Sequence, residues 1–389
     1  MLILYYKAED FVLIITAYEA LCNIGNNINE IYENAINGNN SCFENFDNYL
    51  KGKKVRAGIV KCDLPSIAKD NYNIRCNRLL LKTLQLLNSD ITRLINKYGK
   101  DRIAVVAAST NSGVDDFEKS GIKKHFEIGN PAEFLHKQLG LEGFYTTVST
   151  ACSSGIVAFS VARDLITKEV ADAVIVACTD SLSKVPVYGF NSLEVLSDKP
   201  CNPFSKNRSG MNMGEASAIF IAEREAACGI EVMGIGQSSD IYHSTTPDPD
   251  GVEAVKAMQT ALKEANIEPK DVDYINAHGT ATMANDIMEA TAINKVFGNN
   301  VPVSSTKAMT GHCLGAAAGI EIALCAKLLE NFDGRLYPNI YDGEYDKNLP
   351  YISLVENGKI YKQCRICMCN SFGFGGTNAI IILGIVNEK

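Results

Sequence analysis

The stretch Ser149-Thr150-Ala151-Cys152-Ser153-Ser154-Gly155 decides how the rest of the sequence is interpreted. An apolar and β-branched run, 145–148, leads into it, and a helix-compatible run, 156–167, follows it. The pattern predicts a strand, a tight turn and a helix, with Cys152 at the turn. A thiol at the start of a helix faces unpaired backbone N–H groups and the positive end of the helix dipole, which favour the thiolate. The stretch alone leaves a nucleophile and a buried structural cysteine open, because many free cysteines are simply small core residues.

The overall composition excludes several classes of protein. The chain has 389 residues, of which 46% are hydrophobic and 21% are charged, an ordinary balance for a globular protein. At about 100–200 residues per domain, this length predicts two or three units or one large duplicated fold. The net charge of −8 argues against a general nucleic-acid-binding protein, and any acidic partner would need a local basic patch. We find no stretch of the roughly 20 apolar residues that a membrane span requires.

The cysteines indicate a reducing compartment rather than a metal site or a disulfide framework. There are 13 of them, an odd number, and they are scattered along the chain. Cys364 and Cys367 form a C-x-x-C pair, but no second pair or histidine lies nearby, so we expect no metal. Free thiols and the lack of a recognisable signal peptide predict a cytoplasmic protein.

Buried-strand runs alternate with amphipathic helical runs, which predicts an α/β protein whose sheets are covered by helices. The predicted strands are 11–17, 55–60, 102–108, 171–177, 216–222, 231–238, 272–277, 301–305, 360–368 and 379–383. The predicted helices are 28–37, 79–98, 131–139, 156–167, 286–297 and 316–329. A further helix is expected to begin at a capping box formed by Asp250 and Glu253, with Val252 on its inner face. Residues 1–10 look like an addition ahead of the first strand.

A weak internal echo indicates that the chain contains two similar halves. Val148-Ser149-Thr150 and its small-residue helix recur as Ser304-Ser305-Thr306 and the run 311–318. Such an echo is the sequence signature of a repeated unit. We therefore expect an N-terminal half, 1–228, that carries the cysteine, and a C-terminal half, 229–389, that carries two loop histidines and a Gly/Phe loop.

Two histidines share the local context of the cysteine. His278 follows a predicted buried strand, and His312 precedes a Gly/Ala-rich helix; each lies beside a glycine that allows a ligand to approach the backbone. A single loop histidine is more often structural. Two of them combined with Cys152 form a Cys/His/His set suited to nucleophilic catalysis. The glycine-rich segment 370–378 lacks the lysine of a phosphate loop, and we expect it to place Phe374 beside a pocket.

At this point the motifs identify a family by resemblance. T-A-C-S-S-G, H-G-T-A-T, S-T-K-A-M-T-G-H and N-S-F-G-F-G-G-T-N occur in this order and resemble the β-ketoacyl-acyl-carrier-protein synthases (ketosynthases) of the thiolase superfamily. The segments R-C-N-R-L-L-L, G-N-P-A-E-F-L, G-F-N-S-L-E and S-S-D-I-Y-H-S are similar to the short ketosynthases of bacterial aryl-polyene clusters. The match covers nearly the whole chain from Phe11 onward.

This resemblance implies the fold and the partners. It implies a thiolase-like, five-layered αβαβα fold of two duplicated halves, and an obligate dimer whose sheets continue across the interface. The second subunit would be another copy or a ketosynthase-like chain-length factor. Substrates would arrive as phosphopantetheine thioesters on an acyl carrier protein, and no metal, nucleotide, flavin or other cofactor would be required.

The resemblance also implies the catalytic roles. Cys152 would carry the acyl chain as a thioester, and the backbone N–H groups of Cys152 and Phe374 would form the oxyanion hole. His278 and His312 would stabilise the enolate formed when malonyl loses carbon dioxide. Phe374 would also act as the gate between the two steps.

A second group of residues would support this chemistry. Lys307 and Glu321 match the family's buried ion pair near the histidines. Because carrier proteins are acidic, the docking surface would need basic residues. The expected substrate-binding residues are Thr280, Thr282, Phe372 and Asn378, and the candidate docking residues are Arg75, Arg78, Lys206 and Arg208.

The sequence departs from the family pattern at two positions. Thr16-Ala17-Tyr18-Glu19 stands where the family often has a glycine-rich turn, and Gly155 stands where many relatives have a different small residue or a hydroxyl residue. Three alternatives stay open: a housekeeping fatty-acid elongating synthase, a non-catalytic chain-length partner subunit, and a degradative thiolase. The intact Cys/His/His set argues against the partner subunit, and Cys364, Cys367 and Cys369 lack a thiolase-like C-x-G context.

Overall fold

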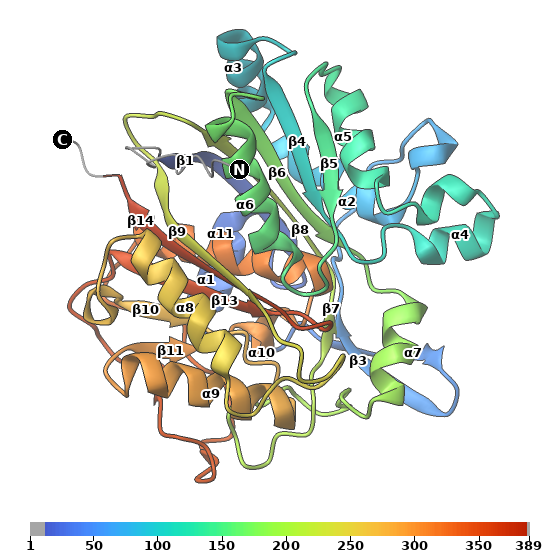
Figure 1. Ribbon diagram of the computed structural model, residues 1–389. Helices are drawn as coiled ribbons and strands as arrows, with labels where there is room; N and C mark the ends of the chain where they lie inside the picture. Colours follow the sequence, from blue (N-terminus) through green and yellow to red (C-terminus); the bar gives the residue numbers. More distant parts are fainter. Residues whose placement is uncertain (1–11, 387–389) are drawn as a thin grey trace.

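A long mixed sheet organises the protein in the computed structural model, which describes residues 12–386 (Figure 1). Its eleven strands run in the order β12-β11-β10-β13-β14-β9-β1-β8-β6-β4-β5. The strands from the first half of the chain are β1 (Leu13–Cys22), β4 (Ile103–Ala108), β5 (Tyr145–Val148), β6 (Ala173–Asp180) and β8 (Ala216–Glu223). Those from the second half are β9 (Ile230–Ser239), β10 (Tyr274–Asn276), β11 (Pro302–Ser304), β12 (Ser353–Leu354), β13 (Ile366–Phe372) and β14 (Thr377–Ile385).

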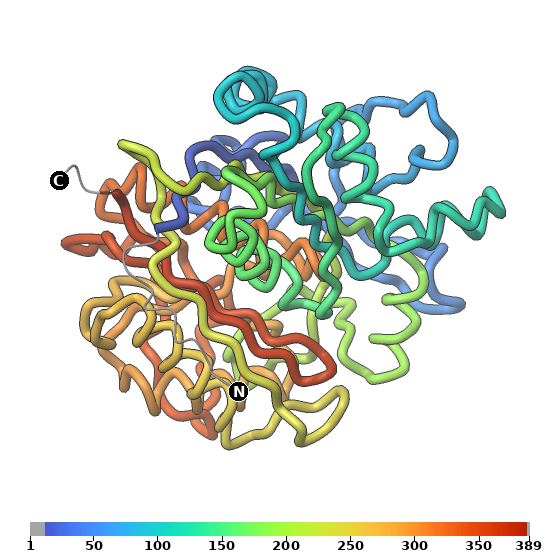
Figure 2. Tube along the Cα trace, turned by 45° about the horizontal axis from the view of Figure 1, so that its top comes forward, coloured from blue at the N-terminus to red at the C-terminus, as the bar shows by residue number. Residues whose placement is uncertain are grey.

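The same strand order occurs twice in this sheet. The first half reads β5-β4-β6-β8-β1, and the second half reads β11-β10-β13-β14-β9. In each half the first three strands are parallel, and the remaining two pairings are antiparallel. A short antiparallel pairing of β1 with β9 joins the halves. Figure 2 shows β9 and β14 running side by side through the middle of the molecule. A three-stranded sheet of β2 (Glu44–Leu50), β3 (Lys53–Gly58) and β7 (Met213–Gly214) lies apart from the long sheet.

Helices cover both faces of the strands in each half. The largest apolar core joins α1 (Ile28–Ile36), α6 (Ser154–Thr167) and α11 (Ala317–Glu330) to strands of both halves. On the opposite face of the first half lie α2 (Arg75–Leu86), α3 (Asn88–Tyr98) and α5 (Asn130–Leu139). On the opposite face of the second half lie α8 (Val252–Glu264) and α9 (Met283–Phe297). The shorter helices are α4 (Val114–Ser120), α7 (Lys184–Ser192) and α10 (Lys307–Thr310).

The central helices α6 and α11 approach each other closely at their first turns. A Cβ atom at Gly155 would lie 2.9 Å from the Cβ of Ala318 on α11. One at Gly319 would lie 2.6 Å from the Cβ of Cys178 on β6, so α11 is packed tightly against β6 as well. Side chains cannot be accommodated at such distances without a shift of their neighbours. The departure from the family pattern at Gly155 therefore has a packing reason, since it brings the start of α6 against the start of α11.

The structure corrects three expectations about local structure. The single helix predicted for 79–98 is two helices that meet at Leu87, because Asn88, Ser89 and Asp90 favour a new helix start over continued propagation. The predicted capping box is absent: α8 is capped by Gly251 without a side-chain hydrogen bond. Val252 is exposed rather than facing inward.

The other predicted strands and helices agree with the structure within a few residues, with two exceptions among the strands. The strand expected at 360–368 begins only at Ile366. The first strand begins at Leu13, while Phe11 and the predicted addition 1–10 lie outside the described residues. Within residues 12–386, no helix combines the length and apolar character that a membrane-spanning helix needs.

Candidate active site

Cys152 lies in a sharp turn between β5 and α6, as the sequence predicts. Ala151 has a left-handed backbone with φ of 52°, which reverses the chain direction. The Ser153 hydroxyl donates to the Thr150 carbonyl at 2.6 Å, and the Thr150 N–H donates to the Ser154 hydroxyl at 2.9 Å. These bonds fix the turn, so that the thiol is held just before Ser153, the N-cap residue of α6.

The end of β13 and the loop after it close over this turn from the second half of the chain. The Ser371 hydroxyl donates to the Cys152 carbonyl at 2.8 Å. A Cβ atom at Gly373 would lie 2.7 Å from the Thr150 carbonyl oxygen, so only glycine allows this approach. The backbone N–H of Phe374 then faces the Cys152 sulfur and acts to lower the pKa of the thiol, although burial outweighs it. The loop therefore provides a backbone donor next to the thiol.

The two histidines meet the cysteine at one point. His278 follows β10, and His312 lies between α10 and α11. The Cys152 sulfur and one ring nitrogen of each histidine all lie within 4.8 Å of one another, and the imidazole rings are perpendicular with centroids 5.4 Å apart. The same three atoms could reach one metal ion, but the nearby Lys307 ammonium disfavours a second cation there. The thiol and the two imidazoles are therefore close enough to contact one group at the same time.

Both imidazoles are neutral at physiological pH. Burial, followed by the charge of Lys307, lowers the pKa of His312 to about 3. The same two causes lower the pKa of His278 well below its usual range. The Leu314 N–H donates to Nδ1 of His312 at 3.0 Å, so the proton of the neutral ring is on Nε2. His312 is thereby prepared as a hydrogen-bond donor to a ligand oxygen.

A buried ion pair lies behind the histidines. Lys307 of α10 and Glu321 of α11 are both about 1% exposed and contact each other directly. Burial by itself lowers the pKa of Lys307, but the Glu321 carboxylate more than compensates and raises it above the ordinary value. The Cys369 thiol lies 3.9 Å from the second carboxylate oxygen. Lys307 therefore stays charged, and its field reaches both imidazoles and the thiol.

The protonation state of Cys152 differs from the thiolate that its place near the start of α6 suggests. Burial raises the pKa of Cys152 to about 12, although Lys307 and the Phe374 N–H act in the opposite direction. Desolvation of the thiolate therefore outweighs the favourable dipole of α6. Cys152 is a protonated thiol until a ligand or a neighbouring group changes its surroundings.

Sequence reasoning missed two buried carboxylates that hold the site loops. Glu289 of α9 accepts the backbone N–H groups of His278 at 2.7 Å and Gly279 at 2.6 Å. Asp180, at the end of β6, accepts the Gly315 N–H at 2.7 Å and thereby ties the segment after His312 to the first half. Acidic residues in a predicted helix or at a strand end suggest solvent exposure, so the sequence offered no direct signal for either role.

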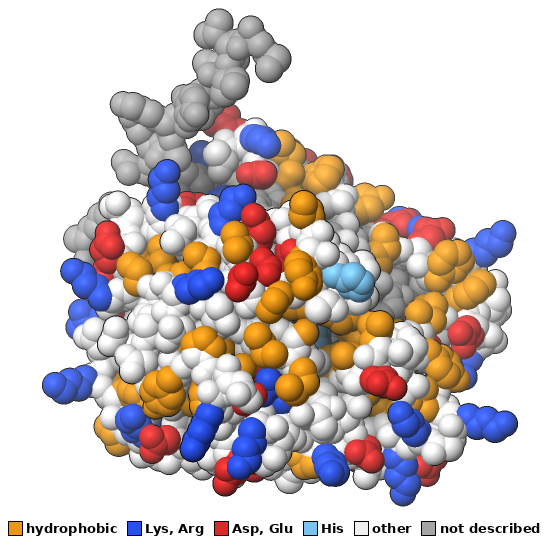
Figure 3. Space-filling model, turned by 60° about the horizontal axis from the view of Figure 1, so that its bottom comes forward, with side chains coloured by type: hydrophobic (Ala, Val, Ile, Leu, Met, Phe, Trp, Pro, Cys, Tyr) orange, Lys and Arg blue, Asp and Glu red, His pale blue; other side chains and the backbone are white. Residues whose placement is uncertain are grey.

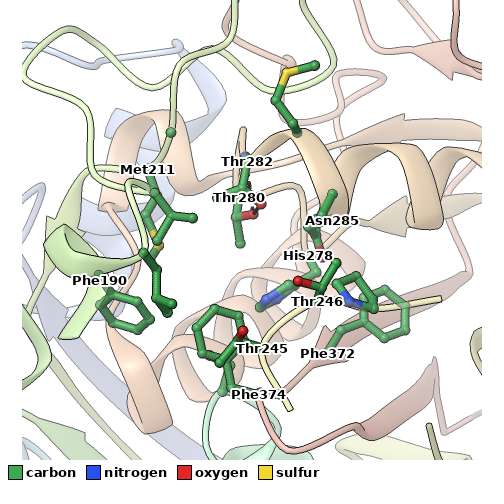
Figure 4. Close-up of a pocket in the computed structure, with 18 of the residues that line it drawn as sticks. Phe190, Met211, Thr245, Thr246, His278, Thr280, Thr282, Asn285, Phe372 and Phe374 are labelled. Carbon is green, nitrogen blue, oxygen red and sulfur yellow. Dashed lines mark hydrogen bonds between the residues drawn. The ribbon is translucent and has the colours of Figure 1, made fainter. Parts of the chain in front are cut away.

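Cys152 lies on the boundary between two cavities. One, of about 430 Å³, has the more polar walls of the two and is called the polar cavity here. It is lined by the two histidines and by all four residues predicted to bind substrate: Thr280, Thr282, Phe372 and Asn378. Figure 4 shows His278, Phe372 and the two threonines around this space. The other, of about 570 Å³, has mainly apolar walls that include Phe126, Ile128, Val185 and Leu314. Phe190 and Phe374 line both cavities, with ring centroids 5.5 Å apart, and form the partition between them.

One of the four predicted docking residues is wrong. Arg208 is only 4% exposed, and its guanidinium donates to the Asp346 carboxylate at 2.7 Å. A residue buried in this way cannot meet a partner protein. Its partner lies 138 positions further along the chain, so the sequence alone did not reveal the pairing.

The other three docking candidates have intramolecular partners. The Arg75 guanidinium donates to the buried Glu215 carboxylate at 2.8 Å. Arg78 donates to two backbone carbonyls, and the exposed Lys206 pairs with Glu344 at 2.6 Å. The charges of Arg75 and Lys206 are therefore offset by carboxylates, whereas Arg78 keeps its positive charge, because backbone carbonyls are neutral.

Comparisons with known proteins agree with the geometry. Residues 129–227 match the family model "Beta-ketoacyl synthase, N-terminal domain", and residues 230–339 match "Beta-ketoacyl synthase, C-terminal domain". The 3-oxoacyl-[acyl-carrier-protein] synthase 2 of Staphylococcus aureus (strain MRSA252) is 31% identical, over 96% of this chain and 98% of that protein. The protein of the same name from Coxiella burnetii is 30% identical, over 96% and 98%.

Solved structures give the same result. The ketosynthase ApeO of Xenorhabdus doucetiae, solved in complex with its chain length factor ApeC, is 36% identical to this chain with a TM-score of 0.91, over 97% of this chain and 98% of that chain. The ishigamide ketosynthase/chain length factor, at 23% identity and a TM-score of 0.86, shares the fold. With its cysteine and two histidines at the junction of two cavities, this chain belongs to the β-ketoacyl synthase family and has the family's α/β, thiolase-like fold.

Proposed function

We propose that this chain is a β-ketoacyl-acyl-carrier-protein synthase that condenses malonyl thioesters with an acyl chain held on Cys152. The observation that carries the proposal is the convergence of one thiol and two neutral imidazoles within 4.8 Å, between a polar and an apolar cavity. A thiol alone would support acyl transfer only. Two hydrogen-bond donors beside it add a site for a developing enolate.

The first step is transfer of the acyl chain. The Cys152 sulfur attacks the thioester carbonyl of the acyl carrier, and the backbone N–H groups of Cys152 and Phe374 donate to the oxygen as it becomes negative. The carrier thiol leaves with the proton that Cys152 gives up. The apolar cavity then receives the chain, since burial of each methylene group there is favourable by about 0.8 kcal/mol.

The second step is decarboxylative condensation. His278 and His312 donate to the carbonyl oxygen of malonyl thioester, so that an enolate forms as carbon dioxide leaves. The enolate carbon attacks the acyl carbonyl, the bond to the Cys152 sulfur breaks, and the thiolate takes up one proton. Neutral imidazoles suit this role, because a charged imidazolium would bind the malonyl carboxylate that has to depart.

The cavity residues supply positioning for these steps. The hydroxyl groups of Thr280 and Thr282 lie 2.9 Å apart in the polar cavity and would bind the phosphopantetheine arm, with Phe372 and Asn378 on the same wall. Phe374 would move between the cavities as a gate, since it and Phe190 separate them. No cofactor enters this mechanism.

For the acyl chain, we propose an aryl-polyene or related polyketide intermediate. Support comes from the segments similar to aryl-polyene ketosynthases and from the higher identity to ApeO, 36%, than to the S. aureus synthase, 31%. Elongation of saturated fatty acids is the second candidate, and the relatives named 3-oxoacyl-[acyl-carrier-protein] synthase 2 favour it. Equal rates with saturated and polyenoyl primers would remove the polyene assignment.

We also propose that the enzyme works as a dimer, either with a second copy or with a ketosynthase-like chain-length factor. β5 is an edge strand of the long sheet, and Phe126, Ile128 and Phe144 are exposed apolar residues near it or at the apolar cavity. Pairing along β5 would cover this region. ApeO, which was solved with its chain length factor, makes the mixed dimer a reasonable arrangement to test.

The repeated strand order supports the division into halves 1–228 and 229–389 and a five-layered αβαβα arrangement. The last strand of the first half, β8, ends at Glu223, and the first strand of the second half, β9, begins at Ile230. The central layer would be the helices α6 and α11, with strands and then outer helices on each side.

Mass spectrometry tests the proposed activity. The protein is incubated with acyl carrier protein loaded with an acyl primer, and then with malonyl carrier protein. We expect an acyl adduct on Cys152 and a carrier-bound product that is two carbons longer, both lost in Cys152→Ala. Condensation that survives in Cys152→Ala would refute the mechanism.

A further inference from the structure

The buried carboxylate of Asp180, the last residue of β6, is held by hydrogen bonds to neutral groups. Among residues 12–386, its partners are backbone N–H and hydroxyl groups rather than cations. Burial raises the pKa of Asp180 to about 6, so the group is mainly ionised at neutral pH. Because a buried charge has lost its hydration, each of these hydrogen bonds is needed to compensate.

These hydrogen bonds come from both halves of the chain. From the segment after β4, the Ser109 hydroxyl donates to Oδ1 of Asp180 at 2.8 Å and the Thr110 hydroxyl to Oδ2 at 2.8 Å. The Asn111 N–H donates to Oδ1 at 3.2 Å. From the segment before α11, the Gly315 N–H donates to Oδ2 at 2.7 Å. One carboxylate thus fixes two segments that lie about 200 positions apart in the sequence.

Each segment contains a strained residue next to its contact with Asp180. Ser112 has φ of 46° and Leu314 has φ of 56°, both in the left-handed region that non-glycine residues rarely adopt. The Ser112 N–H donates at 3.1 Å to the same Ser109 hydroxyl that Asp180 binds, and Leu314 directly precedes Gly315. Such conformations persist only where the surroundings impose them. The contacts of Asp180 supply part of that constraint on both sides.

The two segments form one wall of the apolar cavity. Thr110, Asn111 and Leu314 line this cavity together with Cys152, whereas Asp180 lies behind them. A Cβ atom at Gly315 would lie 2.7 Å from Oδ2 of Asp180 and 3.0 Å from Cγ2 of Thr110. Glycine therefore lets the two segments touch, and the carboxylate between them sets their separation.

This wall differs from the rest of the apolar cavity. Phe126 and Val185 line the same cavity but are 47% and 53% exposed. Figure 3 shows hydrophobic side chains gathered around a hollow on the face that it displays. Exposed side chains can change rotamer at little cost, whereas Leu314 is only 3% exposed and is held by its neighbours. An acyl chain on Cys152 therefore meets a fixed wall as well as an adaptable one.

We propose that Asp180 is a positioning residue that favours rigid acyl chains by holding Thr110 and Leu314 as one fixed wall of the apolar cavity. This inference rests on the proposed function and adds a determinant of chain selectivity. A conjugated chain has fixed torsions, so it fits only while the wall is in place. A saturated chain of the same length can rotate about its single bonds and adapts to a displaced wall.

The variant Asp180→Asn tests this role, since an amide oxygen can accept from only one of the two sets of donors while its NH₂ group faces the other. The unmodified protein and the variant are loaded from octatrienoyl and from octanoyl carrier protein, and mass spectrometry follows the adduct on Cys152. We expect the octatrienoyl rate to fall about tenfold more than the octanoyl rate, a usual size for discrimination in an apolar pocket.

Malonyl decarboxylation is the second readout, and it should change far less than octatrienoyl loading. The backbone of His312 is held separately, because its N–H donates to the Asn212 carbonyl at 2.8 Å and its carbonyl accepts the Gly214 N–H at 3.0 Å. Loss of decarboxylation as large as the loss of loading would show that Asp180 supports the whole site rather than the acyl wall, which would overturn the inference.

Two further variants separate this role from general stability. Asp346→Asn removes another buried carboxylate that lies outside the walls of both cavities, and it should leave the ratio of octatrienoyl to octanoyl loading unchanged. Gly315→Ala inserts a Cβ between Asp180 and Thr110, and it should lower that ratio in the same direction as Asp180→Asn. It also tests the wall if Asp180→Asn fails to fold, which thermal unfolding reveals.

An unchanged ratio in the folded wall variants, or an equal change in Asp346→Asn, would overturn the inference alone. If the unmodified protein loaded neither primer, the proposed function would fail and this inference with it. If the unmodified protein loaded octanoyl faster than octatrienoyl, the polyene assignment would fail, while a further fall of the ratio in Asp180→Asn would still support the positioning role.

Discussion

The two halves of the molecule place different chemistry at the same position of the repeated strand order. In the first half, β5 leads through the Cys152 turn into α6; in the second, β11 leads through α10 and His312 to α11. Each turn contains a non-glycine residue in the left-handed region, Ala151 with φ of 52° and Leu314 with φ of 56°. A left-handed backbone residue near the start of the helix thus occurs in both halves, beside a thiol in one half and beside a hydrogen-bond-donating imidazole in the other.

The halves differ most in their electrostatics. The second half contains the Lys307–Glu321 pair. After burial, the charge of Lys307 is the next largest cause that lowers the pKa of both histidines, and it opposes the effect of burial on the pKa of Cys152. The charge that tunes the cysteine therefore comes from the other half. The comparison teaches that the duplicated turns are not independent sites, because Lys307 of the second half acts on the pKa of Cys152 in the first half as well as on the pKa of both histidines, although burial is the largest cause of all three shifts.

The largest expected effect separates the two chemical roles. His278→Ala should lower the rate of malonyl decarboxylation by about 10²–10³, the typical loss for one donor to a developing negative charge. Acyl loading of Cys152 should be retained, because its backbone donors are untouched. The measurements are carbon dioxide release and the mass of the acyl adduct.

His243→Ala is the matched control for this variant, since His243 lines the same cavity but is exposed. We expect it to change decarboxylation far less. If His278→Ala abolished acyl loading as strongly as decarboxylation, the division of labour between the halves would be wrong.

The pH dependence of the two steps should also differ. With a pKa of about 12, Cys152 should be alkylated by iodoacetamide about tenfold faster for each pH unit between 7 and 10, because the thiolate fraction rises tenfold per unit below the pKa. The exposed Cys228 on the same chain serves as the reference thiol. A plateau for Cys152 near pH 8 would contradict the dominance of burial.

Decarboxylation should stay flat as pH falls from 8 to 5. An imidazole is protonated only as pH falls toward its pKa, and that of His312 is about 3 while that of His278 is well below its usual range. The rate constant is obtained from carbon dioxide release at saturating malonyl carrier protein. An acid limb centred near pH 6.5 would show that at least one histidine titrates normally.

The smallest expected effect concerns the contact between the two central helices. Gly155→Ala should destabilise the protein by about 1–3 kcal/mol, the usual cost of overpacking, because the added Cβ meets Ala318 and Gly319. Thermal unfolding measures this loss. Gly189→Ala on α7 is the control, since no atom lies within 4 Å of its added Cβ and alanine favours a helix over glycine. Equal stability of the two variants would show that the halves can separate at this contact at little cost.

Much of the local structure could be predicted from the sequence. Helix 28–37 is observed at Ile28–Ile36, and strand 102–108 is observed at Ile103–Ala108. Apolar periodicity determines such elements because it reports which face is buried. The prediction was wrong for Val252 and for the helix through Leu87, where turn chemistry rather than periodicity decides the boundary.

The sequence predicted which residues form the candidate site, but it did not predict their protonation states. Motif order indicated Cys152, His278 and His312, and the structure brings their reactive atoms together. The helix position of Cys152 suggested a stabilised thiolate, whereas burial raises its pKa to about 12. The Cys152 turn is covered by the end of β13, where Ser371, 219 positions further along the chain, donates to the Cys152 carbonyl.

The sequence by itself determined the repeated strand–turn–helix units and the side chains at their ends, because both follow from neighbours along the chain. Only the tertiary structure decided which charges are free. Arg208 pairs with Asp346 and is buried, while the exposed Lys51 and Lys54 on either side of Gly52 form no ion pair with any residue in 12–386. The physical reason is that desolvation and ion pairing depend on contacts between distant segments, and these contacts set the protonation of the site and the surface open to a partner.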